Sequence, residues 1–406
     1  MKIALLSIGN ELLSGDTINT NAAWIGKKLT EIGCNVFHQA TVPDEKEPII
    51  NALNHSLKLN PDFILCTGGL GPTEDDITRQ TLFDFVGTES RFDEEYWGYL
   101  SERFKQFGMD IPETNRNQAL VPLNGDVIQN PVGSARGSIF NVNGTTLISL
   151  PGVPAEMKAM MEGTVVPLIQ SKGLKPKQFH TFRTTGIPES SLIEQIAPVM
   201  KKDHGCSIGY YPSLYGVDIR ISQKEKEPVE YLANEIRRVL GVSIYSENGD
   251  SIEEVNVTLA IEKHKTIATA ESCTGGLVGH RITEVSGSSD VYKGGLVVYS
   301  NEAKMDMLDV EKTTLEKFGA VSAETAESMA KNVMKKFDAD FGISVTGIAG
   351  PTGGTEEKPI GLVYIGLADK NNTKVKKYNF GDTRKRNKLR TSQAALNWLR
   401  LTLLSL

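Results

Sequence analysis

The stretch Thr266-Ile267-Ala268-Thr269-Ala270-Glu271-Ser272-Cys273-Thr274-Gly275-Gly276 sets the architecture of the C-terminal part of the chain. A short β-branched run leads within it to a glycine pair, and the apolar-periodic segment 277–285 follows. This pattern predicts a strand, a tight turn and a helix. Such a corner places a hydroxyl and unpaired backbone N–H groups at the carboxyl edge of a sheet, where open α/β folds bind ligands. Ser272 is therefore the first candidate nucleophile.

A serine nucleophile needs a base, and Lys304 is the candidate for it. We expect residues 294–300 to form a buried strand and residues 301–304 to open the next helix. Because neighbouring strand ends meet at one edge of a sheet, Lys304 can reach Ser272, and a desolvated lysine with a lowered pKa can act as a base. The N–H groups of Cys273 to Gly276 would form an oxyanion hole. Two alternatives stay open: Cys273 is the nucleophile, or the turn only starts a helix and Lys304 is a solvated surface residue.

Five motifs in order resemble the signature set of the CinA C-terminal family, whose enzymes are nicotinamide-nucleotide (NMN) amidases: 270–276, Tyr299-Ser300-Asn301-Glu302-Ala303-Lys304, Gly319-Ala320-Val321-Ser322, Gly347-Ile348-Ala349-Gly350-Pro351 and Glu356-Glu357-Lys358-Pro359. The resemblance implies Ser272 as nucleophile and Lys304 as its base, with Tyr299 beside them and no metal. It further implies a substrate site formed by Thr274, Gly275, Gly276, Asn301, Thr346, Gly347, Ala349, Gly350 and Arg384. Arg384 follows Gly381-Asp382-Thr383 where relatives have Gly-Asp-Arg, and it would clamp the nucleotide phosphate.

The whole chain has the size and composition of a soluble protein of two or three domains. It has 406 residues, and 39% of them are hydrophobic and 23% charged. The formal charge of −6 gives no general electrostatic reason to bind nucleic acid or an anionic membrane. The four cysteines show no paired spacing, which is typical of a reducing cytoplasm. No secretion signal or membrane-spanning run is evident, so we expect a cytoplasmic protein.

The N-terminal segment alternates strands and helices. Strands are expected at 2–8, 36–42 and 62–67, and helices at 21–32 and from Pro48 onward. This βαβαβ order predicts a parallel, right-handed, doubly wound sheet.

A glycine-rich loop, Thr67-Gly68-Gly69-Leu70-Gly71-Pro72-Thr73-Glu74-Asp75-Asp76, follows the third of these strands and precedes a helix. Glycines allow a backbone to approach an anion closely, and a helix N-terminus supplies N–H groups, so the loop is a candidate phosphate cradle. Asp75 and Asp76 are hard oxygen ligands suited to a divalent cation. The alternative is that both acidic side chains only cap the helix.

Three N-terminal motifs resemble the molybdopterin-binding-like domain of CinA proteins: Gly9-Asn10-Glu11-Leu12-Leu13-x-Gly15, the 68–76 loop, and Leu150-Pro151-Gly152-Val153-Pro154-x-Glu156-Met157. Asn10 departs from the Gly-Asp-Glu-Leu pattern of the molybdenum-cofactor relatives. The resemblance implies hydrolysis of ADP-ribose to AMP and ribose 5-phosphate with a divalent metal (Mg, Mn or Co). The site would be formed by Glu11, Gly68, Gly69, Gly71 and Thr73, with Asp75 and Asp76 on the metal. The alternative is a module that binds a nucleotide or pterin without turnover.

A lysine-, glycine- and proline-containing segment, 171–177, marks a boundary. Beyond it, the order strand, helix, two strands, helix and strand predicts a ferredoxin-like or KH-like α+β domain, and the CinA family has a KH-like domain here. It has neither a Gly-x-x-Gly clamp nor basic–aromatic interleaving, so we expect a spacer or dimer element and not an RNA binder.

Together these features predict an α/β protein with three domains: a doubly wound N-terminal domain (1–170), a KH-like middle domain (176–248) and an α/β amidase domain (251–406). We expect a bifunctional pyridine-nucleotide salvage hydrolase that acts on NMN and ADP-ribose, is a homodimer, and binds neither membrane nor nucleic acid. The rival class is a DNA-linked competence factor, as the family name suggests.

Overall fold

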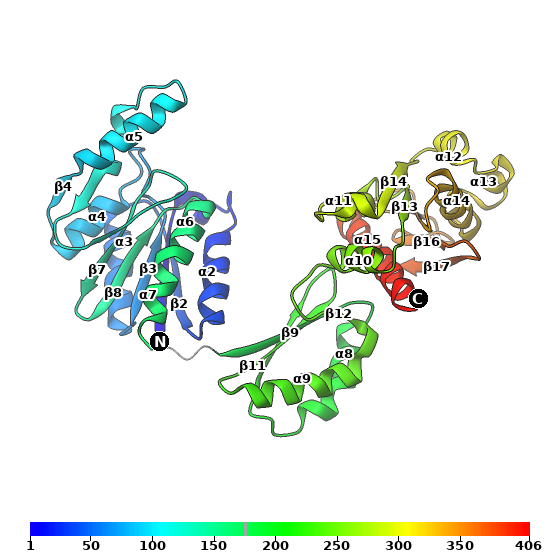
Figure 1. Cartoon of the computed structure of the whole chain (residues 1–406), viewed down its shortest axis with the longest axis horizontal. Helices are drawn as coiled ribbons and strands as arrows, with labels where there is room; N and C mark the ends of the chain where they lie inside the picture. Colours follow the sequence, from blue (N-terminus) through cyan, green and yellow to red (C-terminus); the bar gives the residue numbers. More distant parts are fainter. Residues whose placement is uncertain (174–176) are drawn as a thin grey trace. The chain divides into compact units, whose positions relative to one another are not determined.

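The computed structural model describes residues 1–173 and 177–406. Part of the expected boundary at 171–177, including the predicted start of the middle domain at 176, therefore lies outside the described residues. The chain forms two compact units, Met1–Lys177 and Gln178–Leu406 (Figure 1). None of the helices in the described ranges combines the length and apolar character needed to cross a bilayer.

The first unit is built on a mixed sheet with the strand order β2-β1-β3-β8-β7-β6, in which the first four strands are parallel and β7 and β6 antiparallel. The strands of this sheet are β1 (Lys2–Ile8), β2 (Asn35–Val42), β3 (Phe63–Thr67), β6 (Asp126–Ile128), β7 (Gly137–Val142) and β8 (Thr145–Leu150). A separate pair is β4 (Ser90–Phe92) with β5 (Leu120–Pro122). The helices are α1 (Asn10–Ser14), α2 (Thr20–Glu31), α3 (Lys46–Lys58), α4 (Thr78–Val86), α5 (Glu94–Gln106), η1 (Glu113–Ala119), α6 (Pro154–Met160), η2 (Met161–Val165) and α7 (Val166–Gln170).

Both faces of this sheet are covered, as the predicted doubly wound fold requires. Successive side chains of a strand point to opposite faces, and in β1 Ile3 and Leu5 pack with α2, α6 and α7, whereas Ala4 and Leu6 pack with α3 and α4. Full burial of one such leucine or isoleucine stabilises the fold by roughly 1.5–3 kcal/mol. The predicted strand–helix alternation is confirmed, with two antiparallel strands added at one edge.

The middle domain is an antiparallel sheet with the order β10-β11-β9-β12 and two helices on one face (Figure 1). Its elements are β9 (Gln178–Thr184), α8 (Glu189–Met200), β10 (Ser207–Pro212), β11 (Val217–Gln223), α9 (Lys226–Leu240), η3 (Gly241–Ser243) and β12 (Ile244–Ser246). Helix α9 buries one stripe with helical spacing, which includes Leu232 and Ile236, against β9 and β11. The predicted βαββαβ order is confirmed.

The C-terminal domain has the sheet order β14-β13-β15-β16-β17, with β13, β14 and β15 parallel and the other two strands antiparallel. Helices α10, α11 and α15 cover one face of it, and α12, α13 and α14 the other. Its elements are α10 (Ile252–Glu262), β13 (Ile267–Glu271), α11 (Leu277–Thr283), η4 (Ser288–Asp290), β14 (Tyr292–Val297), α12 (Asn301–Leu308), α13 (Lys312–Phe318), α14 (Ala323–Lys336), β15 (Phe341–Gly347), β16 (Leu362–Ala368), β17 (Thr373–Asn379) and α15 (Arg384–Leu404).

The predicted buried strand at 294–300 is wrong in extent and in burial. Strand β14 covers Tyr292–Val297, and its residues alternate between partly buried and exposed because it is an edge strand paired with β13. Ser300 instead caps α12, since its hydroxyl accepts the N–H of Ala303 at 3.1 Å.

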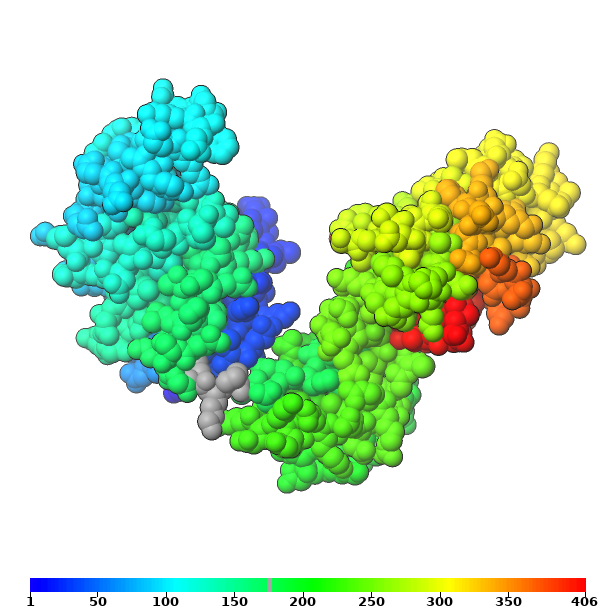
Figure 2. All heavy atoms as spheres, viewed as in Figure 1, coloured from blue at the N-terminus to red at the C-terminus, as the bar shows by residue number. Residues whose placement is uncertain are grey.

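Within the second unit, the middle domain and α15 are in direct contact (Figure 2). The buried Arg400 of α15 donates to the carbonyl oxygens of Ile244 at 3.0 Å and Val242 at 2.5 Å, so the last helix is fastened to the middle domain.

Candidate functional site

Glycine geometry and a buried carboxylate shape the Ser272 corner. Gly275 and Gly276 have φ values of 62° and 91°, which favour glycine. Glu271, the last residue of β13, is 2% exposed, and its carboxylate accepts the N–H groups of Val278 at 3.0 Å and Gly279 at 2.8 Å. These charge-assisted bonds satisfy donors at the start of α11. The strand end, the turn and the helix are thus held as one piece.

Lys304 lies beside Ser272, as predicted. Its Nζ is 3.2 Å from Ser272 Oγ, and both residues are buried, at 1% and 7% exposed. Burial lowers the pKa of Lys304 below its ordinary value of 10.5. The alternative of a solvated surface lysine is therefore wrong.

The Lys304 amine is surrounded by hydrogen-bond acceptors. Nζ lies 3.0 Å from the carbonyl oxygen of Val298, 3.2 Å from that of Tyr299 and 3.4 Å from that of Ser300. A neutral amine has two N–H donors and one lone pair. With its two donors on two of these carbonyls, a neutral amine can direct its lone pair to the hydroxyl hydrogen of Ser272. The ammonium form instead donates to Ser272 Oγ. The same carbonyls hold the ammonium form once the proton has moved.

Cys273 is poorly suited to be the nucleophile. Its side chain belongs to the apolar core and is 5% exposed. Burial raises the pKa of its thiol to about 12. The thiolate is the reactive form of cysteine, so the geometry favours Ser272.

The predicted oxyanion hole needs a correction. Gly275 N–H donates to Ser272 O at 3.0 Å and is not free, because the turn closes on itself. Ser272 N–H donates to Val345 O at 2.9 Å. The N–H groups of Cys273, Thr274 and Gly276 remain as candidates.

Residues predicted for the substrate site come together with Tyr299 from distant segments. Arg384, at the start of α15, donates to Gly350 O at 3.0 Å and to the Tyr299 hydroxyl at 2.8 Å. The neighbouring Asn387 is 1% exposed and donates to Ala349 O at 3.0 Å. The start of α15 therefore holds both the 347–350 loop and Tyr299.

Other predicted substrate residues have different surroundings. Thr346 is buried and its hydroxyl donates to Ala320 O at 2.6 Å, so it joins two parts of the domain. Asn301 is exposed at the start of α12. Thr274 is fully buried, and its hydroxyl has no hydrogen-bond partner within the described residues. The substrate roles of these residues and of Gly347 stay predictions.

Glu271 and Lys388 were not predicted. A Cβ built on Gly275 would lie 3.6 Å from Lys388 Nζ, so this amine approaches the turn. Lys388 is four residues from Arg384 on α15, and residues at that spacing share a helix face. The spacing was the available signal for Lys388, whereas nothing in the local pattern marked Glu271 as a buried acceptor.

The first unit contains a cavity of about 690 Å³ at the carboxyl ends of β1 and β3. Gly68 and Gly69 line it with φ values of 106° and 65°, and a Cβ on Gly68 would lie 2.0 Å from Ile8 O. The cavity is also lined by the predicted Glu11, Gly71, Asp75 and Asp76. The structure thus brings most of the predicted N-terminal residues to one place.

Asp76 and Thr73 bond each other. Asp76 Oδ2 accepts the Thr73 N–H at 2.9 Å and the Thr73 hydroxyl at 2.6 Å, and Thr73 does not line the cavity. This contact lies within the loop and does not cap α4, whose N-cap residue is Ile77, so it is not the helix capping of the alternative interpretation.

The carboxylates that line the cavity are the oxygen ligands that a hard cation prefers, but they do not form a complete set of ligands. Within the described ranges, no group of three or more His, Cys, Asp or Glu side chains is arranged to hold a metal ion. Mg²⁺ is commonly held by one or two carboxylates together with substrate phosphates. Asp75 and Asp76 fit that arrangement.

Sequence reasoning missed two further acids of this cavity, Asp44 and Glu156. Asp44 accepts the N–H of Asn10 at 2.9 Å, and Glu156 accepts the amide of Asn130 at 2.9 Å. Burial raises the pKa of both carboxyls, and the nearby carboxylate of Glu11 adds to the effect on Asp44. Glu156 lies in a quoted motif, whereas Asp44 had no local signal.

Comparisons with known proteins cover all three domains. Residues 4–171 match the family model described as "Probable molybdopterin binding domain". Residues 180–246 match the damage-inducible protein CinA KH domain, and residues 249–403 match the CinA C-terminal domain.

The full length is also matched. A competence-damage inducible protein of Clostridium novyi is 40% identical over 100% of this chain and 99% of its own length. One from Caldicellulosiruptor saccharolyticus is 38% identical over the whole of both chains. The crystal structure of the competence/damage inducible protein CihA from Agrobacterium tumefaciens is 41% identical over 38% of this chain and 97% of that chain, with a TM-score of 0.36. The three domain models in this order, together with the full-length relatives, show that the chain belongs to the CinA family of competence-damage inducible proteins.

Proposed function

We propose that the C-terminal domain deamidates nicotinamide mononucleotide to nicotinate mononucleotide and ammonia. The observation that carries this proposal is the buried Lys304 amine 3.2 Å from the Ser272 hydroxyl. A hydroxyl paired with a desolvated amine is equipped for acyl transfer. The sequence resemblance supplies the substrate.

The two residues suffice for a balanced reaction. Lys304 Nζ takes the hydroxyl proton as Ser272 Oγ bonds to the carboxamide carbon, and N–H groups of the turn stabilise the resulting oxyanion. The C–N bond of this tetrahedral intermediate then breaks. Lys304 gives its proton to the departing nitrogen, which leaves as ammonia. A water molecule then attacks the acyl-serine, with Lys304 taking one proton and giving it back to Oγ. Nicotinate mononucleotide is released.

The cationic start of α15 supports a nucleotide substrate. Arg384 links Tyr299 with Gly350, and Lys388 approaches Gly275. A guanidinium is well shaped to bind phosphate oxygens. We propose that Arg384 binds the phosphate of NMN.

Ammonia release from NMN tests this proposal, with wild type, Ser272→Ala, Lys304→Met and Cys273→Ala compared without added metal. We expect Ser272→Ala and Lys304→Met to lose at least about a hundredfold in kcat, on the scale of general-base contributions. Cys273→Ala should keep near wild-type activity. A fully active Ser272→Ala with an inactive Cys273→Ala would make Cys273 the nucleophile. An inactive, folded wild type would refute the amidase proposal.

We further propose that the N-terminal domain hydrolyses ADP-ribose to AMP and ribose 5-phosphate. A glycine-lined cavity with oxygen-rich walls supports this, because the Gly68–Gly69 backbone can approach a pyrophosphate closely. Asp75 and Asp76 would hold a divalent cation, which neutralises phosphate charge when bound. Glu11 and Asp44 line the same cavity and would keep the cation and substrate in place.

The test measures AMP formation from ADP-ribose with Mg²⁺, Mn²⁺ or Co²⁺ for wild type, Asp76→Ala and the control Glu74→Gln, which changes a neighbouring acid outside the cavity lining. We expect Asp76→Ala alone to lose activity. Undiminished turnover in Asp76→Ala would remove it from the metal role. Calorimetric binding of ADP-ribose without AMP formation in the wild type would favour a binding module.

A further inference from the structure

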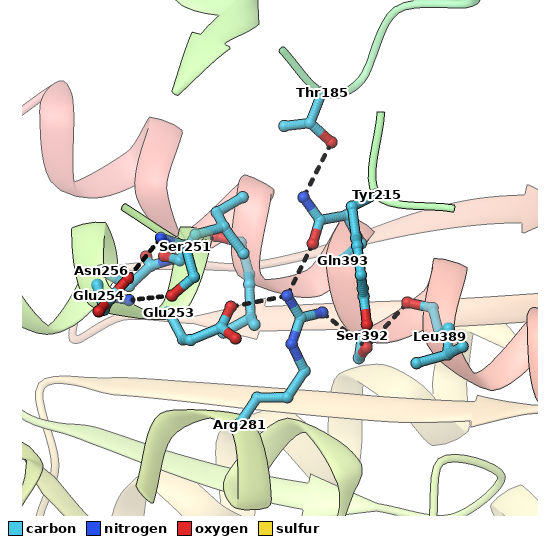
Figure 3. Close-up of polar contacts among 12 residues, drawn as sticks. Thr185, Tyr215, Ser251, Glu253, Glu254, Asn256, Arg281, Leu389, Ser392 and Gln393 are labelled. Atoms are coloured by element: carbon cyan, nitrogen blue, oxygen red, sulfur yellow. Dashed lines mark hydrogen bonds and ion pairs between the residues drawn. The ribbon is translucent and has the colours of Figure 1, made fainter. Parts of the chain in front are cut away.

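A buried arginine joins the helix behind the candidate nucleophile to the rest of the second unit. Arg281 of α11 is 8% exposed and donates to Glu253 Oε2 at 2.7 Å, Ser392 Oγ at 2.9 Å and Gln393 Oε1 at 2.8 Å. Figure 3 shows its guanidinium between these side chains, which come from α10 and α15. A buried charge needs such partners, and a planar fork of donors fixes its direction.

The middle domain completes this shell. Gln393 uses its amide nitrogen to donate to the Thr185 hydroxyl at 3.2 Å, and Thr185 directly follows β9. The ring of Tyr215, from the β10–β11 turn, lies 5.0 Å from the Arg281 guanidinium carbon. Figure 3 marks the Gln393–Thr185 hydrogen bond with a dashed line and labels Tyr215. Two residues of the middle domain thus contact Arg281 or its partner Gln393.

Helix α11 is one of the elements that hold the Ser272 turn, together with the sheet. The helix has seven residues and begins directly after Gly276. Its first N–H groups are bonded to Glu271, the residue before Ser272. Lys304 is positioned separately by α12. A shift of α11 would therefore pull on the Ser272 side of the 3.2 Å contact with Lys304 and not on the Lys304 side.

We propose that the middle domain is a positioning element for the candidate amidase site, acting through Tyr215 and Thr185 on Arg281 and from there on the Ser272 turn. This inference rests on the proposed function of Ser272 and Lys304. It gives the KH-like domain a role that does not involve RNA. Tyr215, Thr185 and Arg281 are positioning residues, because none of them contacts the reacting atoms.

The test uses matched pairs in the full-length chain. Tyr215→Leu removes the aromatic ring and Tyr215→Phe keeps it; Thr185→Val removes the hydroxyl and Thr185→Ser keeps it. We expect Tyr215→Leu and Thr185→Val to lower kcat for NMN deamidation by about tenfold or more, since a shift of about 1 Å can cost a hundredfold. KM should change less, and the Phe and Ser variants should stay near wild type.

A second readout separates this inference from the amidase proposal. A fluorophosphonate probe reacts with an activated serine, and mass spectrometry of the labelled peptide identifies Ser272. We expect slower labelling of Ser272 in Tyr215→Leu and Thr185→Val. A wild type that is labelled at Ser272 but releases no ammonia would refute NMN as the substrate. The labelling rates of the variants relative to wild type would still decide whether the middle domain positions Ser272. If Tyr215→Leu and Thr185→Val both keep the kcat and the labelling rate of the wild type, the inference is overturned. It is also overturned if the wild type is not labelled at Ser272.

Discussion

Lys304 makes the candidate amidase pH-dependent. Only the neutral amine can take the Ser272 proton, and burial lowers the pKa of Lys304 from 10.5. Activity should therefore rise with pH through this lowered pKa and level off below pH 10.5. The pH profile of kcat/KM measures this limb. Lys304→Arg, which stays protonated, should remove the activity across the range, and a profile without an acid limb would contradict a lysine base.

Arg384 should determine affinity and not the rate of bond cleavage. Its contacts are to Tyr299 and Gly350 and not to Ser272 or Lys304. We expect Arg384→Gln to raise KM for NMN about tenfold, the loss of one charge-assisted contact of about 1.5 kcal/mol, with kcat nearly unchanged. The phosphate-free nucleoside should respond little. Arg386→Gln on the same helix is the control, and equal effects of both substitutions would argue against a specific clamp.

For single residues, topology made the pairing of Ser272 with Lys304 predictable, because the parallel strands β13 and β14 end at one edge of the sheet. Glu271 and Asp44 were not predictable in the same way. Their surroundings are made by hydrogen bonds to turns and by other segments, and a single acidic residue carries no periodic signal for such contacts. The Gly275 N–H was also wrongly expected to be free, since a turn can consume its own donors.

At the scale of elements, the β3–α4 loop depends on one glycine. A Cβ on Gly68 would meet Ile8 O at 2.0 Å, and its φ is 106°. Gly68→Ala should destabilise the first unit by about 3 kcal/mol or more, from backbone strain and collision together. Gly87→Ala is the matched control: its φ is 70° with open space around it, so strain of about 1 kcal/mol is expected.

Urea unfolding followed by tryptophan fluorescence measures this difference in a Trp398→Phe background, in which the remaining Trp24 and Trp97 both lie in the first unit. Equal losses in free energy of unfolding in the two variants would show that the close approach of Gly68 to Ile8 does not contribute to stability.

Element types were more predictable than their places in a sheet. The strand–helix alternation around β1 and β13 follows from hydrophobic periodicity, which is local. Strand β14 is an edge strand because of the order in which the strands pair, and the sequence of residues 294–300 alone does not contain that order. The exposed alternate positions of β14 are the visible result.

At the scale of the whole molecule, the two proposed activities should be separable. Each unit has its own apolar cores and its own candidate site. Ser272→Ala should leave ADP-ribose hydrolysis unchanged, and Asp76→Ala should leave NMN deamidation unchanged, since substitutions without shared partners act independently. Assays of both activities in both variants check this. Loss of the second activity in either variant would reveal coupling.

The burial of Cys273 beside the nucleophile has a consequence for oxidative stress. Peroxides and alkylating agents react with thiolates, and this thiol has a pKa of about 12 and 5% exposure. Oxidants that disable cysteine hydrolases should therefore leave ammonia release by this protein intact after brief peroxide treatment, and rapid inactivation would mean that the thiol becomes accessible. An amidase built on Ser272 and Lys304 would keep supplying nicotinate mononucleotide while a cell is under the damage for which its relatives are named.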